Sequence, residues 1–149
     1  MKTLFRKLAV MAFCLTTTVL NASADNKKPV TFEQMPAPAQ QFVKTHFASS
    51  KVLATTFERE LLEKSYDVVL NDGTKLEFDS KGEWTDVSCP KSGVPSKVLP
   101  DGIKTYLNSN FPNVKVKKIE RDSREYEVTL ENGTEITFNK TFQVKDIDL

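Results

Sequence analysis

Four carboxylates in the first half of the sequence have a spacing that could hold a cation. They are Asp67, Glu77, Asp79 and Glu83. In the strand register derived below, Asp67 lies opposite Glu77 and Asp79 lies opposite Glu83, and opposed like charges are unfavourable in a sheet. Calcium accepts loose carboxylate clusters, so a weak calcium site is one interpretation of this pattern. The other is a solvated acidic face, partly neutralised by Lys75 and Lys81.

The sequence offers little for a catalytic centre. His46 is the only histidine, and Asn110 takes the matching place in a second copy of the pattern, so we interpret His46 as a structural or solvent-facing residue. A multi-histidine zinc site within one chain is excluded. Cys89 has no neighbouring histidine or basic cluster to activate its thiol, which indicates an inert cysteine. We therefore predict that the protein is not an enzyme and needs no cofactor, calcium excepted.

The elements that position these residues are revealed by an internal repeat. "YDVVLNDGTKLEF" occupies Tyr66 to Phe78, and "YEVTLENGTEITF" occupies Tyr126 to Phe138. The alternation of apolar and polar residues on both sides of Asn-Asp-Gly or Glu-Asn-Gly is typical of a β-hairpin. The sequence thus predicts the same hairpin twice.

The register of each hairpin follows from its turn. A three-residue loop ending in Gly73, with positive φ, pairs Tyr66 with Phe78 and Val68 with Leu76, so that every apolar residue lies on one face. A two-residue loop would mix the faces. The same loop ending in Gly133 pairs the equivalent residues of the second copy, Tyr126 with Phe138 and Val128 with Ile136. A further turn after Asp79 places Trp84 opposite Phe78 in the core, and Val144 takes that place in the second copy.

A short helix and a first strand precede each hairpin. Met35-Pro36 and Leu99-Pro100 open segments with apolar residues at helical spacing, and Val52 to Phe57 and Val114 to Ile119 alternate as strands do. We predict an α+β fold of two tandem repeats. Each repeat has one helix and a four-stranded antiparallel meander, and the two sheets are joined side by side with the helices on one face.

The domain boundaries follow from the N-terminal segment and from composition. Three basic residues precede an apolar run from Leu8 to Leu20, and Ala22-Ser23-Ala24 suits signal peptidase, so residues 1–24 are predicted to be a signal peptide. Residues 25–88 form the first repeat, the Ser-, Gly- and Pro-rich residues 89–98 a linker, and residues 99–149 the second repeat. The mature protein is then periplasmic or secreted, without a membrane span after cleavage.

Charge excludes two classes of partner. Removing the three basic residues of the signal peptide leaves 18 of 21 basic residues against 20 acidic ones. No basic patch for nucleic acid or anionic lipid is implied.

The repeated motif resembles a known family. Both copies contain Y-x-V-x-L-x-x-G-T-x-[LI]-x-F, and Asp79 to Trp84 adds D-x-x-G-x-W, behind a signal peptide. This pattern is similar to that of the PepSY-like, β-lactamase-inhibitor-like family of secreted bacterial proteins. The resemblance implies a concave sheet surface backed by helices and a role in binding or inhibiting an enzyme. The family's inhibitor uses aromatic side chains on that surface, whereas our predicted open-face positions contain none, so β-lactamase inhibition is not expected.

We therefore expect a non-enzymatic binding module that contacts a protein or peptide, and inhibition of that partner is one form that this contact would take. The expected contact surface is the open sheet face together with the hairpin tips at Asn71, Asp72, Glu131 and Asn132. The alternative function is a calcium-responsive envelope protein that binds the cation at the four carboxylates named above.

Overall fold

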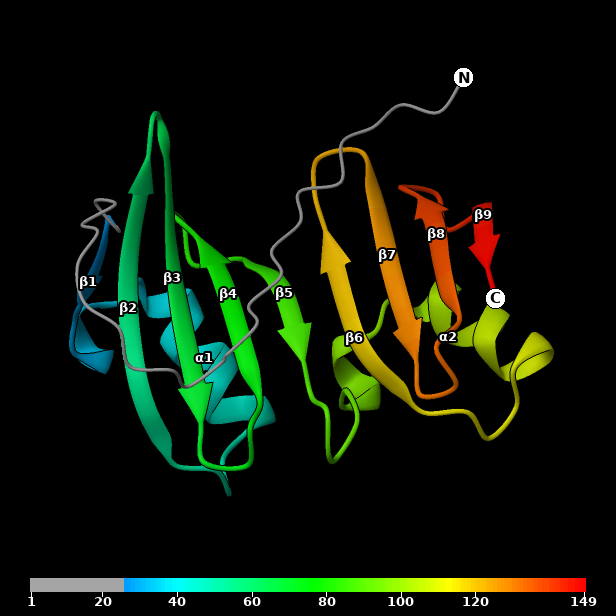
Figure 1. Ribbon diagram of the computed structural model, residues 1–149, viewed down its shortest axis with the longest axis horizontal. Helices are drawn as coiled ribbons and strands as arrows, with labels where there is room; N and C mark the ends of the chain where they lie inside the picture. The colour runs from blue at the N-terminus through cyan, green and yellow to red at the C-terminus, as the bar shows by residue number, and fades with distance from the viewer. Residues whose placement is uncertain (1–25) are drawn as a thin grey trace, which may run out of the picture.

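Within residues 26–149, nine strands form one antiparallel sheet in which each strand pairs with the next along the chain (Figure 1). The computed structural model describes residues 26–149, so the predicted signal peptide lies outside the described residues. The strands are β1 (Lys27–Pro29), β2 (Val52–Glu60), β3 (Glu63–Leu70), β4 (Lys75–Asp79), β5 (Trp84–Ser88), β6 (Val116–Arg121), β7 (Glu125–Leu130), β8 (Glu135–Asn139) and β9 (Val144–Asp148).

The prediction of two four-stranded sheets joined side by side was wrong, because the structure has one continuous sheet. At the junction of the repeats, β5 pairs with β6 in antiparallel register, with Val87 opposite Ile119 and Ser88 opposite Lys118. An additional strand, β1, pairs with β2 at the outer edge. The backbone hydrogen bonds therefore run without interruption from the first repeat into the second.

The predicted hairpin register is confirmed in both repeats. Tyr66 lies opposite Phe78 and Val68 opposite Leu76, and the second repeat has the equivalent pairs. Gly73 and Gly133 adopt φ of +88° and +91°, the left-handed conformation that the three-residue loop requires and that glycine adopts without steric cost. The apolar pattern and the turn residues therefore specify the same register.

Two helices cover one face of the sheet (Figure 1). Helix α1 (Ala37–His46) and helix α2 (Asp101–Asn110) each start after a proline, as predicted, and short 3₁₀ turns at Phe32–Gln34 and Ser96–Val98 precede them. Both helices are only ten residues long and need the sheet for their stability.

The contact of each helix with the sheet is built around an aromatic pair. Phe42 of α1 packs edge-to-face on Phe78 with ring centroids 5.5 Å apart. Tyr106 of α2 packs on Phe138 in the same way at 5.3 Å. Such pairs contribute about 0.5–1.5 kcal/mol beyond the burial of their area. The two repeats thus share the central contact of their cores.

The segment of residues 89–98, predicted as a linker, is tied to the sheet. Cys89 is fully buried and its N–H donates to the carbonyl of Lys117 at 2.8 Å. The N–H of Val94 donates to the carbonyl of Val116, also at 2.8 Å. These bonds help to hold the second repeat in a fixed position on the first.

The repeats exchange a small and a large residue where a turn meets a helix. In the first repeat, Gly82 of the β4–β5 turn lies against α1, and a Cβ there would come within 2.9 Å of the backbone N of Ala39. In the second repeat the turn residue is Phe142, and the helix supplies Gly102, where a Cβ would lie 2.6 Å from Phe142 Cδ2. The packing is preserved because the side chain has moved from one partner to the other.

This exchange predicts that the effect of Gly102→Ala on the free energy of unfolding has opposite signs in the wild type and in a Phe142→Gly variant. In the wild type the new methyl group overpacks against Phe142 and should lower the free energy of unfolding by about 1–3 kcal/mol. In a Phe142→Gly background the same change should raise the free energy of unfolding by up to about 1 kcal/mol, because alanine favours helix over glycine. Denaturant unfolding of the four proteins measures both effects, with Ser109→Ala, an exposed change in α2, as the control. Equal effects of Gly102→Ala in both backgrounds would contradict the exchange.

Candidate functional site

The sheet face opposite the helices, called the open face below, carries a line of carboxylates. Cross-strand pairing places Asp67 opposite Glu77, Glu77 opposite Asp86, Asp86 opposite Glu120, and Glu120 opposite Glu127. These five residues, from the five consecutive strands β3 to β7, are called the acidic row. Because side chains directly opposite each other lie about 4.5–5.5 Å apart at Cβ, each carboxylate has a like charge as its neighbour.

Two lysines partly neutralise the acidic row. Lys27 Nζ lies 3.0 Å from Asp67 Oδ2 and 3.3 Å from Glu58 Oε2. Lys118 Nζ lies 3.1 Å from Asp86 Oδ2 and 3.0 Å from Glu120 Oε1. Burial alone would lower the pKa of both lysines, but the neighbouring carboxylates raise it, so both stay charged. The row keeps a net negative charge because five carboxylates face two ammonium groups.

Glu77 and Glu127 also belong to the row, and neither forms an ion pair with another residue in the range 26–149. Partial loss of water around the carboxylate, followed by repulsion from Asp67, raises the pKa of Glu77, although Thr85 Oγ1 donates a hydrogen bond to it at 3.3 Å. Loss of water and then repulsion from Glu120 raise the pKa of Glu127. A positive charge added beside either carboxylate would therefore stabilise its ionised form.

Asp86 is the most perturbed member of the acidic row. Its side chain is 23% exposed, and burial raises the pKa of its carboxyl to about 7, against the opposing attraction of Lys118 and with further repulsion from Glu120. Asp86 also lies on β5, where the two repeats meet. The proton occupancy of this carboxyl therefore changes near neutral pH at the centre of the sheet.

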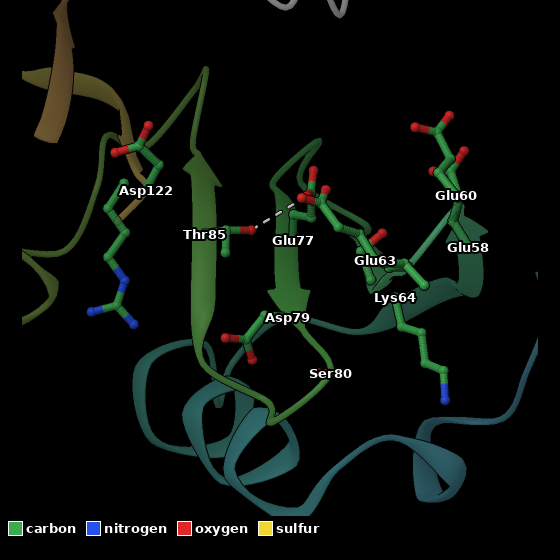
Figure 2. Close-up of a pocket in the computed structure, with 12 residues that line it drawn as sticks. Glu58, Glu60, Glu63, Lys64, Glu77, Asp79, Ser80, Thr85 and Asp122 are labelled. Carbon is green, nitrogen blue, oxygen red and sulfur yellow. Dashed lines mark hydrogen bonds between the residues drawn. The ribbon is translucent and has the colours of Figure 1, made fainter. Parts of the chain in front are cut away.

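A groove with a volume of about 610 Å³ lies on the open face beside the acidic row (Figure 2). Its lining is mainly acidic, with carboxylates from several strands and turns: Glu58, Glu60, Glu63, Glu77, Asp79 and Asp122. Leu62, Lys64 and Arg121 are among its other lining residues. In Figure 2, Glu77 and Asp79 on β4 lie between Thr85 and Asp122 on one side and Glu58 and Glu60 on the other.

The four carboxylates predicted to bind calcium are divided by the structure. Asp67 and Glu77 face each other as expected. Asp79 uses Oδ1 to accept hydrogen bonds from the N–H groups of Lys81 (2.8 Å) and Glu83 (3.0 Å), which closes its own turn. The Glu83 side chain is 67% exposed and lies 3.9 Å from Arg121. Within residues 26–149, no three His, Cys, Asp or Glu side chains are grouped so as to hold a metal ion.

Asp86 and Glu120 were missed by the sequence reasoning. A β-bulge shifts the register between Glu77 and Phe78, whose partners are Asp86 and Trp84, and so turns Asp86 to the open face. The sequence contained a signal, because the apolar residues Trp84 and Val87 lie three positions apart, where simple alternation allows two or four. Glu120 lies one residue beyond the predicted end of its strand.

The predicted hairpin-tip residues stabilise their own loops. Asn71 Oδ1 accepts a hydrogen bond from the N–H of Lys51, and Glu131 Oε1 accepts one from the N–H of Lys115. Asp72 and Asn132 each accept a hydrogen bond from the N–H two residues later. The hydrogen bond from Thr74 lowers the pKa of Asp72. Both tips lie at the same end of the strands, the lower end in Figure 1.

Burial and packing indicate structural roles for Cys89, His46 and Trp84. Burial raises the pKa of the Cys89 thiol to about 11, so the thiol stays protonated and a poor nucleophile. The His46 ring packs on Phe42 at 4.7 Å, and burial, followed by the charge of Lys97, lowers its pKa. Trp84 is buried opposite Phe78 as predicted, and the Arg121 guanidinium lies 4.2 Å from its ring centroid.

Asp86 predicts a pH dependence of stability. Because its pKa is about 7 in the folded state and about 3.9 in an unfolded chain, the folded state keeps a proton that the unfolded state loses. This contribution to stability is complete below about pH 4 and is lost as the pH rises through about 7. Asp86→Asn should therefore make the free energy of unfolding less dependent on pH over this interval, measured by urea unfolding.

The matched control is Asp146→Asn, because Asp146 takes the equivalent place on the exposed edge strand β9. Its pH profile should follow that of the wild type. Lys118 keeps Glu120 as a partner in the Asp86→Asn variant, so the ion pair is not wholly lost. Parallel profiles for wild type and Asp86→Asn would contradict the assignment.

Comparison with known proteins gives one family and several solved structures. The model of the PepSY-like family, described as beta-lactamase-inhibitor-like, matches residues 64–146. A periplasmic protein of the DUF2874 family from Bacteroides vulgatus is 51% identical, with a TM-score of 0.83, over 85% of this chain and 99% of its own. A protein from Bacteroides thetaiotaomicron, described as calcium-regulated and periplasmic, is 47% identical, with a TM-score of 0.82, over 85% of this chain and 99% of its own.

A third structure, a periplasmic protein from Bacteroides vulgatus, is 36% identical with a TM-score of 0.78, over 83% of this chain and 99% of its own. No curated protein matches the sequence significantly. None of the helices within residues 26–149 has the length and apolar character needed to cross a bilayer. The relatives confirm the predicted periplasmic location. The matched motif and the relatives show that this chain belongs to the PepSY-like, beta-lactamase-inhibitor-like family of periplasmic proteins.

Proposed function

We propose that the protein is a non-catalytic binding module of the periplasm whose open face holds a positively charged segment of a protein or peptide partner. The observation that supports this proposal most directly is the acidic row, in which five consecutive strands place a carboxylate opposite the next. The helices cover the other face of the sheet, so this face is available to a partner (Figure 1).

The energetic basis is relief of repulsion. A directly opposed pair of like charges destabilises a sheet by a fraction of a kcal/mol up to about 1 kcal/mol. The row has four such pairs, and Lys27 and Lys118 offset only part of their repulsion. Lysine or arginine side chains of a partner would offset this cost and would take the place that water and salt ions have in the free protein. Binding of the partner therefore reduces a repulsion that is present in the free protein, and this reduction adds to the affinity.

The row also sets the size of the partner segment. Strands lie about 4.8 Å apart, so the five strands of the row span about 19 Å, which is the length of about six residues of extended chain. The hairpin tips at Asn71–Asp72 and Glu131–Asn132 border this face at one end in our proposal. Their side-chain oxygens hold the loops in shape, so they contribute a rigid border and backbone contacts.

The family description points to an enzyme as a first partner to assay. Proteins of this family are described as beta-lactamase-inhibitor-like. Because the predicted open-face positions contain no aromatic anchor, we propose a peptidase with a basic surface, and not a β-lactamase, as the partner class to examine first. Binding across the open face would inhibit such an enzyme only if the basic surface borders its substrate cleft.

The first test uses hexalysine as a probe of the acidic row. We expect the protein to bind labelled hexalysine at low salt, and Glu77→Lys to weaken that binding at least tenfold because it reverses the charge at the second position of the row. The measurement is fluorescence anisotropy, repeated with hexaglutamate. Glu33→Lys makes the same change in charge away from the row and should leave the affinity within about twofold. Equal losses in the two variants would mean that only net charge matters and would refute the proposed surface.

Calcium is a second candidate ligand of the same face. The Bacteroides thetaiotaomicron relative, described as calcium-regulated, is 47% identical to this chain. Asp67 and Glu77 face each other, and Glu77 accepts only the hydrogen bond of Thr85 among the described residues. We propose weak calcium binding that uses these two carboxylates and completes its coordination with water, with Asp79 and Glu83 contributing if their turn rearranges.

This candidate predicts a calcium-specific gain in stability. A ligand that binds only the folded state adds about 2.7 kcal/mol at a hundredfold excess over its dissociation constant. The melting temperature should rise more with calcium than with magnesium at equal ionic strength, and Glu77→Gln should remove the difference. Glu135→Gln, an outward-facing change on β8, serves as the matched control. Equal shifts with the two metals would reduce the effect to charge screening.

A further inference from the structure

The hairpin formed by β2 and β3 carries an extension that the second repeat lacks. Phe57 pairs with Tyr66 across eight intervening residues, whereas the equivalent pair, Arg121 and Tyr126, has four. The extension, residues 58–65, is called the arm below. It reaches past the ends of the neighbouring strands β4 and β5 (Figure 1). The fold does not require the arm, because the same hairpin closes without it in the second repeat.

The tip of the arm exposes two large apolar side chains. Leu61 is 95% exposed and Leu62 is 97% exposed. Leu61 has a φ of +49°, a conformation that is unfavourable for leucine and for which hairpins of this length prefer glycine. The second repeat has the polar residues Asp122, Ser123 and Arg124 at this place, and Asp122 accepts hydrogen bonds that close the turn. The leucines therefore bring neither burial nor turn stability to the free protein.

We propose that the arm is a docking element that inserts Leu61 and Leu62 into an apolar pocket of a protein partner, and that basic side chains border this pocket. Protein interfaces have an apolar core surrounded by a polar rim, which is the arrangement that the tip offers. The proposal goes beyond the binding of a cationic segment by the acidic row, because it names a second contact surface. The two surfaces can be tested separately.

The basic border follows from the charges of the arm. Glu60 pairs with Glu63 next to the tip, and Glu58 lies on the same side of the hairpin two residues away. Arg59 is paired with Lys64 between these two positions, and the alternation of side chains along a strand directs both to the opposite side, although Lys64 also borders the groove. The tip thus presents Leu62, which lines the groove, with three acidic neighbours toward the open face. A pocket with basic residues on that side complements this arrangement.

The same charges argue against two other occupants. A membrane surface with anionic lipids would repel Glu58, Glu60 and Glu63 at the depth to which the leucines insert. A second copy of this chain would bring the acidic side of the arm, or the acidic row, close to another acidic arm. A distinct protein with a basic rim is the occupant that the charges favour.

The experiment places the photo-cross-linking amino acid p-benzoylphenylalanine at position 62 of the full mature chain. A second protein has it at position 53, because Leu53 is also an exposed leucine of β2, 66% exposed, at the other end of the strand. After irradiation in periplasmic extract, one cross-linked protein should form from position 62 and not from position 53. Cross-linking that is equal at both positions, or absent at position 62, would overturn the proposal.

The cross-linked protein is then purified and its affinity is measured with unmodified variants. The double variant Leu61→Gly/Leu62→Ser should bind at least tenfold more weakly, while its melting temperature equals or exceeds that of the wild type because glycine removes the strain at position 61. Glu60→Lys should also weaken binding, and more so at low salt. Leu53→Ser is the matched control and should bind as the wild type does. Unchanged affinity of the double variant would refute the docking role.

Two further measurements distinguish the other occupants. Flotation with vesicles of phosphatidylethanolamine and phosphatidylglycerol should show no binding, and sedimentation of the purified protein should give the same mass for wild type and double variant. Leucine-dependent flotation would assign the tip to a membrane surface. A leucine-dependent dimer would assign it to a second copy. Either result would replace the protein partner proposed here. Glu127→Lys reverses a charge at the far end of the acidic row, outside the groove that Leu62 lines, and should leave the cross-link at position 62 intact. Failure of the acidic-row function and failure of this proposal are therefore distinguishable.

Discussion

The structure depends on the cross-strand register of one antiparallel sheet. Side chains alternate between the faces with a period of two, so a shift by one residue would move the whole core to the solvent. Val68, Leu76, Val128 and Ile136 are all at most 2% exposed, and this burial fixes the register in both repeats. The same register determines the open face, because the residues between the core positions must also align. The acidic row is therefore a geometric consequence of the core, and the chain cannot escape its repulsion by sliding one strand along another.

The junction of the repeats adds a second constraint. Pairing of β5 with β6 continues the hydrogen bonds of the sheet, and Arg121 of β6 contacts Trp84 of β5 from the side of the core. Arg121 Nε donates to the Trp84 carbonyl at 2.6 Å, and its guanidinium covers the indole ring. The sheet therefore behaves as one body across the seam, which keeps Asp86 and Glu120 opposite each other. Without this junction the acidic row would be two short, separate groups.

The parts of the fold that local sequence specifies were predictable, and those that depend on distant pairing were not. The hairpins at Gly73 and Gly133 were predicted because the glycine, the loop length and the apolar alternation require the same register. The joining of β5 to β6 pairs residues such as Val87 and Ile119, which are far apart in the sequence, and no local pattern indicates it. Asp86 was assigned to no face because a bulge interrupts the alternation beside it. The most perturbed carboxylate of the site was thus hidden by the one irregularity of its strand pair.

The comparison of the two repeats separates what the fold needs from what it tolerates. Both repeats keep the aromatic contact between helix and sheet, and they preserve the packing of turn on helix even after exchanging Gly82 for Phe142. They differ at the arm, which adds four residues, a strained Leu61 and two exposed leucines to the first repeat only. Local departures of this kind lower stability unless something outside the chain compensates for them, and natural proteins concentrate them at functional sites. The arm and the acidic row both belong to the open side of the sheet, and both would become favourable through contact with a partner. The compensating interaction is therefore best sought on the open face of the first repeat, where the groove lined by Leu62 and Glu77 brings the two features together.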